Sequence, residues 1–209
     1  MANIIISSGT TNITSGKSLT SVHILNSGAV VVFTGGKLVD AYVYRGGCAT
    51  VSSGGLIDSA LLDSGGSIFI CSKGVINQVD LYREGWVSAA GGSVYSATVN
   101  SGGALEVRGV SSGGSVISGF ASNVNIVSGG QMWLGLYAMG SAVNVMSGSL
   151  TVALPGGVLQ EAVIGSGTTS GSSESAQVHI EYGAWGNLNY VYTDGLMVVS
   201  NGEIGRAHV

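Results

Sequence analysis

The sequence predicts an all-β fold, a single-stranded parallel β-solenoid (β-helix) built from rungs of about 19 residues. Three observations predict it: a glycine period, apolar columns that recur with that period, and the lack of a sustained helical periodicity. Glycine accounts for 36 of the 209 residues, whereas charged residues make up 9% of the chain and apolar residues 45%. This composition favours a folded core with many tight turns over a disordered chain.

Glycines close turns at a fixed spacing. The last glycines of successive turns follow one another at intervals of 19 residues: Gly9, Gly28, Gly47, Gly66 and Gly85. A second series runs between them: Gly16, Gly36, Gly55, Gly74 and Gly92. Each repeat therefore divides into a short half of about 8 residues and a long half of about 11, and each half reads as one strand and one turn.

Apolar side chains recur at the same positions in each repeat. In the short halves, positions two and four form the predicted core: Val30, Val32, Ala49, Val51, Ile68, Ile70, Val87 and Ala89. In the long halves, positions two, five and seven do so: Leu38, Ala41, Val43, Ile57, Ala60, Leu62, Ile76, Val79, Leu81, Val94, Ala97 and Val99. The step from position two to five breaks strict alternation, which predicts a bend or bulge in each long half. Such repeats bury their apolar faces only by stacking, and we expect roughly 10–11 rungs.

The second half of the chain is less regular. We expect the extra residues between Gly114 and Gly130 to leave the rod as a loop near 115–123, while Val116 keeps its inward position together with Val124 and Ile126.

In the following rungs we assign Leu150 and Val152 to the core. The polar stretch near 165–175 is interpreted as a loop or a linker. We expect residues 1–209 to form a single β-solenoid domain.

The charge and hydropathy of the sequence argue against nucleic-acid binding, membrane insertion and a secretory signal. The net charge is −4 with seven Lys and Arg residues, so nucleic acid is not an expected partner. No apolar run approaches the length of a membrane span, so we expect no membrane insertion by this segment. Met1 to Ile6 have neither a basic start nor an apolar stretch of the needed length, and no secretory signal is expected in this sequence.

Turn motifs carry a family resemblance. Motifs of the form Val-Ser-Ser-Gly-Gly, Asn-Ser-Gly-Gly and Val-Ser-Gly-Gly recur at Val51–Gly55, Asn100–Gly103, Val110–Gly114 and Val127–Gly130. They resemble the AIDA-type repeats of bacterial autotransporter adhesins. The resemblance implies a non-enzymatic passenger β-helix at the bacterial cell surface or in the extracellular space, concerned with adhesion, self-association or biofilm. Its implied partners are a host-cell surface, a second copy of the chain, or an O-heptosyltransferase.

Serines that precede the turn glycines have two interpretations. Serine and glycine suit tight turns because serine bonds the local backbone and glycine tolerates positive φ. The family resemblance implies a second role, as hydroxyl acceptors for O-linked heptose. The candidate acceptors are Ser53, Ser64, Ser101, Ser112 and Ser128.

Outward aromatic side chains also have two interpretations. Rings that only stack along the rod would stabilise it, whereas rings with polar neighbours are common in sugar-contacting and protein-contacting surfaces. We place a candidate interaction surface at Trp133, Tyr137 and the loop around Phe120. Cys48 and Cys71 differ by four positions along their strands, about 13 Å, so two free thiols are predicted.

The alternative function is a polysaccharide-processing or glycan-binding β-helix, such as a tailspike or lyase-like protein, and a third is a purely structural spacer. Glycan-cleaving solenoids need carboxylates gathered on one face. The aspartates fall at different positions of their long halves and form no column: Asp40, Asp58, Asp63 and Asp80. No catalytic, cofactor-binding or metal-binding residues are therefore assigned, and no cofactor is expected.

Overall fold

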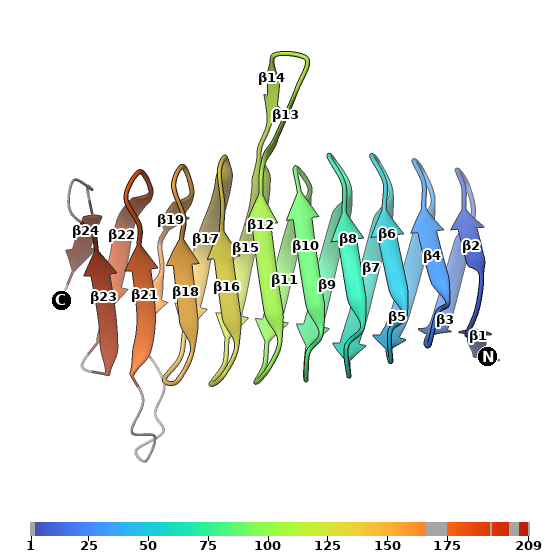
Figure 1. Cartoon of the computed structure of the whole chain (residues 1–209), viewed down its shortest axis with the longest axis horizontal. Helices are drawn as coiled ribbons and strands as arrows, with labels where there is room; N and C mark the ends of the chain where they lie inside the picture. Colours follow the sequence, from blue (N-terminus) through green and yellow to red (C-terminus); the bar gives the residue numbers. More distant parts are fainter. Residues whose placement is uncertain (1–2, 166–174, 193, 201–204, 209) are drawn as a thin grey trace.

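Two parallel sheets wind around one apolar interior in the computed structural model, which describes residues 3–165, 175–192, 194–200 and 205–208. Successive strands alternate between the sheets, and the rungs stack along one axis to form a rod (Figure 1). The described residues contain no helix. The predicted all-β parallel β-solenoid is confirmed, with about ten turns.

The 12-stranded sheet, here the long-strand sheet, lies at the back in Figure 1. Its strands are β1 (Ile4–Ile6), β3 (Ser18–Ile24), β5 (Lys37–Tyr44), β7 (Leu56–Asp63), β9 (Val75–Leu81), β11 (Ser93–Val99), β15 (Gly119–Ile126), β17 (Ala138–Val145), β19 (Val158–Gln160), β20 (Val163–Ile164), β22 (Trp185–Val191) and β24 (Gly205–His208).

The 10-stranded sheet, here the short-strand sheet, lies in front. Its strands are β2 (Thr10–Ile13), β4 (Ala29–Val32), β6 (Cys48–Val51), β8 (Ser67–Ile70), β10 (Trp86–Ala90), β12 (Ala104–Arg108), β16 (Gln131–Leu134), β18 (Leu150–Ala153), β21 (Ala176–Ile180) and β23 (Gly195–Val199). The turns after these strands form the upper edge in Figure 1, and the turns after the long strands form the lower edge.

The core follows the predicted columns in the regular rungs. Val30 pairs with Ala49 in the short-strand sheet, and Leu38 pairs with Ile57 in the long-strand sheet. These side chains, like the other core residues predicted between Val30 and Val99, are buried. Parallel pairing at a separation of 19 residues places equivalent side chains above one another, so each apolar column becomes a continuous row inside the rod.

Most rungs of the long-strand sheet carry the predicted bend at repeat position four; β7 and β9, where Ser59 pairs with Gln78, do not have a left-handed residue there. The pairing register skips this position, for example between Thr20 and Val22 of β3 and their partners in β5. Six residues at the fourth position have φ between 51° and 56°: Ser21, Asp40, Ser96, Asn123, Ala142 and Glu161. A left-handed residue inserted between inward-facing positions lets the next side chain turn inward again, which explains the spacing from position two to position five.

In the rungs that follow the first one, backbone proximity requires the glycine that closes the turn. A Cβ added to Gly28 would lie 2.0 Å from the carbonyl oxygen of Ile6 in the rung before, and one added to Gly66 would lie 2.0 Å from that of Val43. Only glycine permits this approach. The 19-residue glycine period is therefore the period at which neighbouring rungs touch.

The excursion expected near 115–123 begins earlier in the structure. Val110–Ser112 (β13) and Ser115–Ile117 (β14) form an antiparallel hairpin that projects from the upper edge (Figure 1), and β15 is already part of the long-strand sheet. The inward assignment of Val116 is wrong, because this side chain is 50% exposed on the hairpin. Gly113 and Gly114 both have positive φ, as a two-residue hairpin turn requires. At Val51–Gly55 the same Val-Ser-Ser-Gly-Gly motif ends a short strand and forms the turn after it. At Val110–Gly114 the short strand β12 has already ended, so the motif forms part of the hairpin instead.

The core assignment of Leu150 and Val152 is also wrong. Both side chains point outward and are half-buried, while Thr151 and Ala153 face the interior. The parallel register explains the difference, because Thr151 pairs with the inward-facing Met132 of β16. In this rung the pairing register between neighbouring strands, rather than side-chain hydropathy, decides which residues face the core.

The polar stretch near 165–175 lies almost wholly outside the described residues, which omit 166–174. The single-domain assignment of residues 1–209 stays a prediction. A search of the described chain finds no helix that is long and apolar enough to cross a membrane.

Candidate functional site

All five candidate acceptor serines have exposed side chains. Ser64, Ser101 and Ser128 lie at the lower edge, each in a turn that follows a long strand. Ser53 lies in a turn of the upper edge, and Ser112 lies on the projecting hairpin. The structure therefore divides the candidates between two edges rather than bringing them into one site. Their accessibility follows from the turns, which face away from the core.

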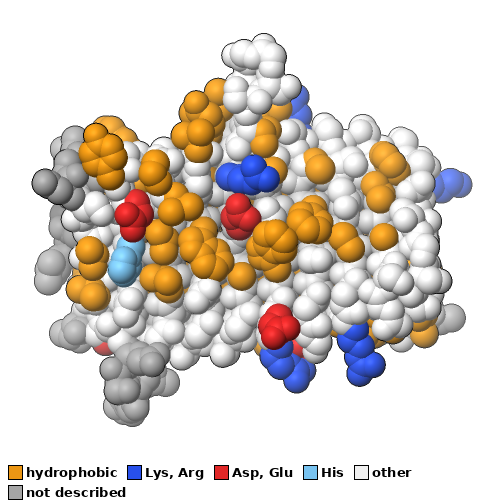
Figure 2. Space-filling view, in the orientation of Figure 1, with side chains coloured by type: hydrophobic (Ala, Val, Ile, Leu, Met, Phe, Trp, Pro, Cys, Tyr) orange, Lys and Arg blue, Asp and Glu red, His pale blue; other side chains and the backbone are white. Residues whose placement is uncertain are grey.

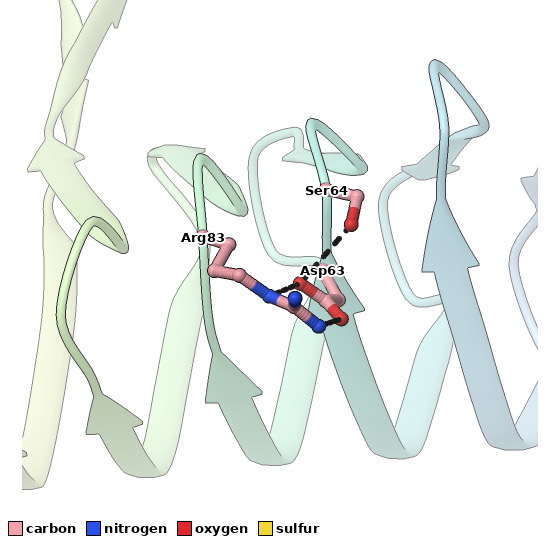
Figure 3. A network of polar contacts seen from close by, with 3 residues as sticks. All are labelled: Asp63, Ser64 and Arg83. Atoms are coloured by element: carbon pink, nitrogen blue, oxygen red, sulfur yellow. Dashed lines mark hydrogen bonds and ion pairs between the residues drawn. The ribbon is translucent and has the colours of Figure 1, made fainter.

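Charged side chains surround Ser64. Its Oγ donates a hydrogen bond to Asp63 Oδ1 at 3.3 Å (Figure 3). Arg83, from the next turn along the rod, donates from Nε to Asp63 Oδ1 at 2.9 Å and from Nη2 to Oδ2 at 2.6 Å. The two-point contact with the guanidinium lowers the pKa of Asp63 and raises that of Arg83. The serine hydroxyl is thus held beside a carboxylate that stays ionised in mild acid.

Two candidate serines border one hollow at the lower edge. It has a volume of about 520 Å³ and is lined by Ser64, Arg83, Glu84, Ser101 and Gly102. The backbone connects these turns, since Arg83 N donates to Ser101 O at 3.2 Å and Gly65 N donates to Arg83 O at 3.2 Å. The charged turn with Arg83 and Glu84 therefore lies between the two turns that carry the serines.

The three aromatic residues of the predicted interaction surface lie in different places. Trp133 points outward from β16 in the short-strand sheet and is half-buried. Phe120 is in strand β15 of the long-strand sheet rather than in a loop, and its ring lies 5.8 Å from that of Tyr95. Tyr137 lies in the turn between the sheets, where its carbonyl accepts a hydrogen bond from Gly119 N. The structure does not bring these side chains together.

Apolar side chains form a stripe on the outer face of the short-strand sheet (Figure 2), and the strand register places Trp133 in it, beside Val152. The apolar stripe, which Gln177 and His179 of β21 interrupt, consists of Phe69, Trp86, Trp133, Leu150, Val152, Leu196 and Val198. Phe69 and Trp86 contact each other edge to face with ring centroids 5.3 Å apart. Sequence reasoning missed Leu150 and Val152 because it placed them in the core. The register that turns Thr151 inward also turns these two outward.

One charged pair lies within the stripe. Glu106 follows Ser88 in register and precedes Trp133 in the same outward row of the sheet. Its carboxylate lies 3.6 Å from Arg108 Nε and accepts a hydrogen bond from Ser88 Oγ at 3.2 Å. The stripe therefore presents an acidic and a basic group beside its central aromatic residue.

The four aspartates occupy different positions, as predicted. Asp58 accepts a hydrogen bond from Asn77 at 2.8 Å and forms an ion pair with Lys37 at 2.9 Å, which lowers its pKa. Asp63 is engaged by Arg83, whereas Asp40 and Asp80 lie on separate rungs of the long-strand sheet. Within the described ranges, no three His, Cys, Asp or Glu side chains are grouped in a way that could hold a metal ion.

The prediction of two free thiols is confirmed. Cys48 lies on β6 and is half-buried, and Cys71 follows β8 and is exposed. Burial raises the pKa of the Cys48 thiol, although hydrogen bonds with Thr50 and Ser67 oppose that shift.

No protein-family model matches this chain, and no curated protein sequence matches it. Among solved structures, the chain is similar to a hyper-glycosylated fragment of TibA, whose glycosylation was catalysed by TibC. The likeness has a TM-score of 0.65 at 22% sequence identity and covers 99% of this chain and 82% of the TibA fragment. It shows that the two chains share the fold.

Proposed function

We propose that this chain is a non-enzymatic adhesive module of a bacterial surface, which associates with a second copy of itself through the apolar stripe. The stripe is the observation that carries the proposal. Apolar surface is costly to leave in water, and exposed apolar patches rimmed by polar residues mark interaction sites. The resemblance of the turn motifs to AIDA-type repeats and the fold shared with the TibA fragment support a surface or extracellular location.

A second copy fits the stripe because the charged groups within it are complementary. In a two-fold arrangement the same patch faces itself, so Glu106 of one copy can approach Arg108 of the other. The aromatic rings of Phe69, Trp86 and Trp133 would then be covered by apolar partners. Self-association of rods on one cell or between cells would give adhesion without a separate receptor.

We further propose that the exposed turn serines accept O-linked heptose from a glycosyltransferase. Each of the five candidates is exposed at an edge where an enzyme can reach it. The TibA fragment, which shares the fold, is hyper-glycosylated. Sugars attached at both edges would leave the two sheet faces uncovered, so this modification is compatible with association through the stripe.

Sedimentation equilibrium tests the self-association. We expect the wild-type chain to dimerise and Trp133→Ser to weaken dimerisation at least tenfold. Tyr95→Ser is the matched control, because Tyr95 is an exposed aromatic residue of the opposite sheet. Circular dichroism checks that each variant is folded. A monomeric wild type, or equal loss in both variants, would contradict the proposal.

Mass spectrometry tests the modification. The intact mass of protein from its native host is compared with 20.9 kDa, and we expect an excess in steps of one heptose. Fragment spectra should place the sugars on exposed serines such as Ser64 and Ser101. Ser147 and Ser149 occupy the same edge but are buried, and they should stay unmodified. An unmodified intact mass would refute acceptor function.

A further inference from the structure

The bend in the long strands shapes the outer face of their sheet. The side chain at repeat position five, such as Ala41 in β5 and Val143 in β17, turns inward, so the side chains at positions four and six stand on either side of a row with no side chain of its own. Two hollows lie along this row, one at each end of the regular part of the rod.

The first hollow spans β15, β17 and the β19–β20 rung and has a volume of about 310 Å³. Its lining is mostly amide and carboxylate: Asn123, Asn125, Ala142, Asn144, Glu161 and Val163. Asn144 Nδ2 donates a hydrogen bond to Asn125 Oδ1 at 2.8 Å, which orients both amides. The volume is at the lower end of the range typical of small-molecule sites.

The second hollow spans β5, β7 and β9 and has a volume of about 200 Å³. Asp40 and Asp80 contribute carboxylates to its lining, Ser59 a hydroxyl and Tyr42 an aromatic ring. The Tyr42 ring stacks on His23 with centroids 4.7 Å apart and is 37% exposed, so a preoriented ring borders the hollow.

The two hollows belong to the same columns of the sheet. Asn125 of the first hollow pairs with Thr98 of β11, and Thr98 pairs with Asp80 of the second, so the intervening rung continues the polar row. The strands at the centres of the hollows, β7 and β17, are four rungs apart, or about 19 Å at 4.8 Å per rung. A ligand that contacts both hollows must therefore be extended and must lie along the rod.

We propose that this row of the long-strand sheet binds an extended neutral oligosaccharide. Amides both donate and accept hydrogen bonds and carboxylates accept them, which suits the many hydroxyls of a sugar chain. The Tyr42 ring offers a flat apolar surface for one sugar ring. Neither hollow is lined by Lys or Arg, and the carboxylates and the net charge of −4 disfavour anionic polysaccharides.

This site is independent of the proposed self-association. The two functions use opposite faces of the rod, because the hollows lie on the long-strand sheet and the apolar stripe on the short-strand sheet. A substitution on one face leaves the other face unchanged, so an experiment can contradict one proposal without contradicting the other.

Binding is tested with the full chain on an array of immobilised hexasaccharides of glucose, mannose, galactose and N-acetylglucosamine, with polygalacturonate as the anionic comparison. We expect at least one neutral hexasaccharide to bind. Asn144→Ala should weaken that binding at least tenfold, and Ala142→Trp should abolish it by filling the hollow. Asn77→Ala, an exposed amide of the same sheet outside both linings, is the matched control and should leave binding unchanged.

Three results would overturn the proposal. The first is binding to none of the neutral probes. The second is binding that Asn144→Ala and Ala142→Trp leave unchanged although circular dichroism shows both variants folded. The third is preference for polygalacturonate over every neutral hexasaccharide.

Discussion

A glycine recurs at the position of Gly66 because a side chain would not fit there, and not because the backbone needs a left-handed φ. Its φ is not in the left-handed region, yet a Cβ would lie 2.0 Å from Val43 O and 2.4 Å from the Val43 carbonyl carbon. Because the obstacle is backbone that pairs with the next rung, it cannot move like the end of a flexible side chain. The stacking distance therefore requires glycine here.

We predict that Gly66→Ala lowers the free energy of unfolding by about 3 kcal/mol, the upper part of the usual range for overpacking. Gly9→Ala is the control, since a Cβ there meets nothing within 4 Å and only the positive φ of 70° opposes it. That variant should lose about 1 kcal/mol. Urea unfolding measures both, and equal losses would show that conformation alone selects the glycines.

The Asp63 carboxylate offers a second test at single-residue scale. Arg83 lowers its pKa by two hydrogen bonds and by charge, so we predict that Arg83→Gln raises the pKa of Asp63 toward its ordinary value. Carboxyl chemical shifts in an NMR titration measure this change. The pKa of Asp58, which Lys37 lowers, should stay where it is.

The same pair has a predictable effect on stability. A depressed folded-state pKa stabilises the fold above the unfolded-state pKa, and the contribution is lost as the pH falls through the folded-state value. Arg83 is exposed and Asp63 is half-buried at the surface, so the effect should be small and screened by salt. An unchanged Asp63 titration in Arg83→Gln would show that the ion pair does not persist in solution.

The parallel register of strand β18 turns the polar side chain of Thr151 into the apolar core. Thr151 is fully buried between Met132 and Val178 in neighbouring rungs, and its hydroxyl has no hydrogen-bond partner. We predict that Thr151→Val raises the free energy of unfolding by about 1 kcal/mol, because it removes an unsatisfied buried polar group without changing the shape. Urea unfolding measures it. Thr50→Val, on an outward position of β6, should change stability by less than about 0.5 kcal/mol; a loss in Thr151→Val would refute the interpretation.

The projecting hairpin is an element that the rod does not need. Its two strands pair only with each other, and β12 and β15 on either side of it belong to regular rungs. We predict that replacing residues 109–119 with Ser-Gly-Gly, as at Ser53–Gly55, leaves the melting temperature within about 4 °C of wild type. Thermal unfolding followed by circular dichroism measures it. A larger loss would mean that Val110 and Ile117, which lie near Gly91, stabilise the rod.

Across the whole molecule, the interior changes from aliphatic to partly polar. The rungs from β5 to β11 bury almost only aliphatic side chains, whereas the later rungs also bury Ser147, Ser149, Thr151 and Asn189. The Asn189 side-chain nitrogen has no hydrogen-bond partner. Solenoid stability is close to a sum over rungs and their interfaces, so the unsatisfied polar atoms of Thr151 and Asn189 weaken the rungs that contain them.

We predict that amide hydrogens of β18, β21 and β22 exchange faster than those of β5, β7 and β9. Hydrogen exchange followed by mass spectrometry measures this difference through peptides from each region. In Thr151→Val the exchange of β18 should slow, while that of β5 should not change. Uniform exchange along the rod would show that the molecule opens only as one unit.

The repeat pattern by itself determined the fold class, the regular core columns and the bend in the long strands. These features depend on local chemistry and on a period that neighbouring rungs share, so they are visible wherever the period holds. Val116, Leu150 and Val152 were misassigned because a hydropathy pattern does not show which residue the ladder pairs with which.

Only the tertiary structure decided which side chains lie together on each surface. It separated Trp133 from Phe120 and Tyr137, joined Trp133 with Phe69 and Trp86 in one stripe, and aligned the hollows of the opposite sheet. These groupings depend on parallel register between residues far apart in the chain. Rung stacking creates that register, and no single rung contains it.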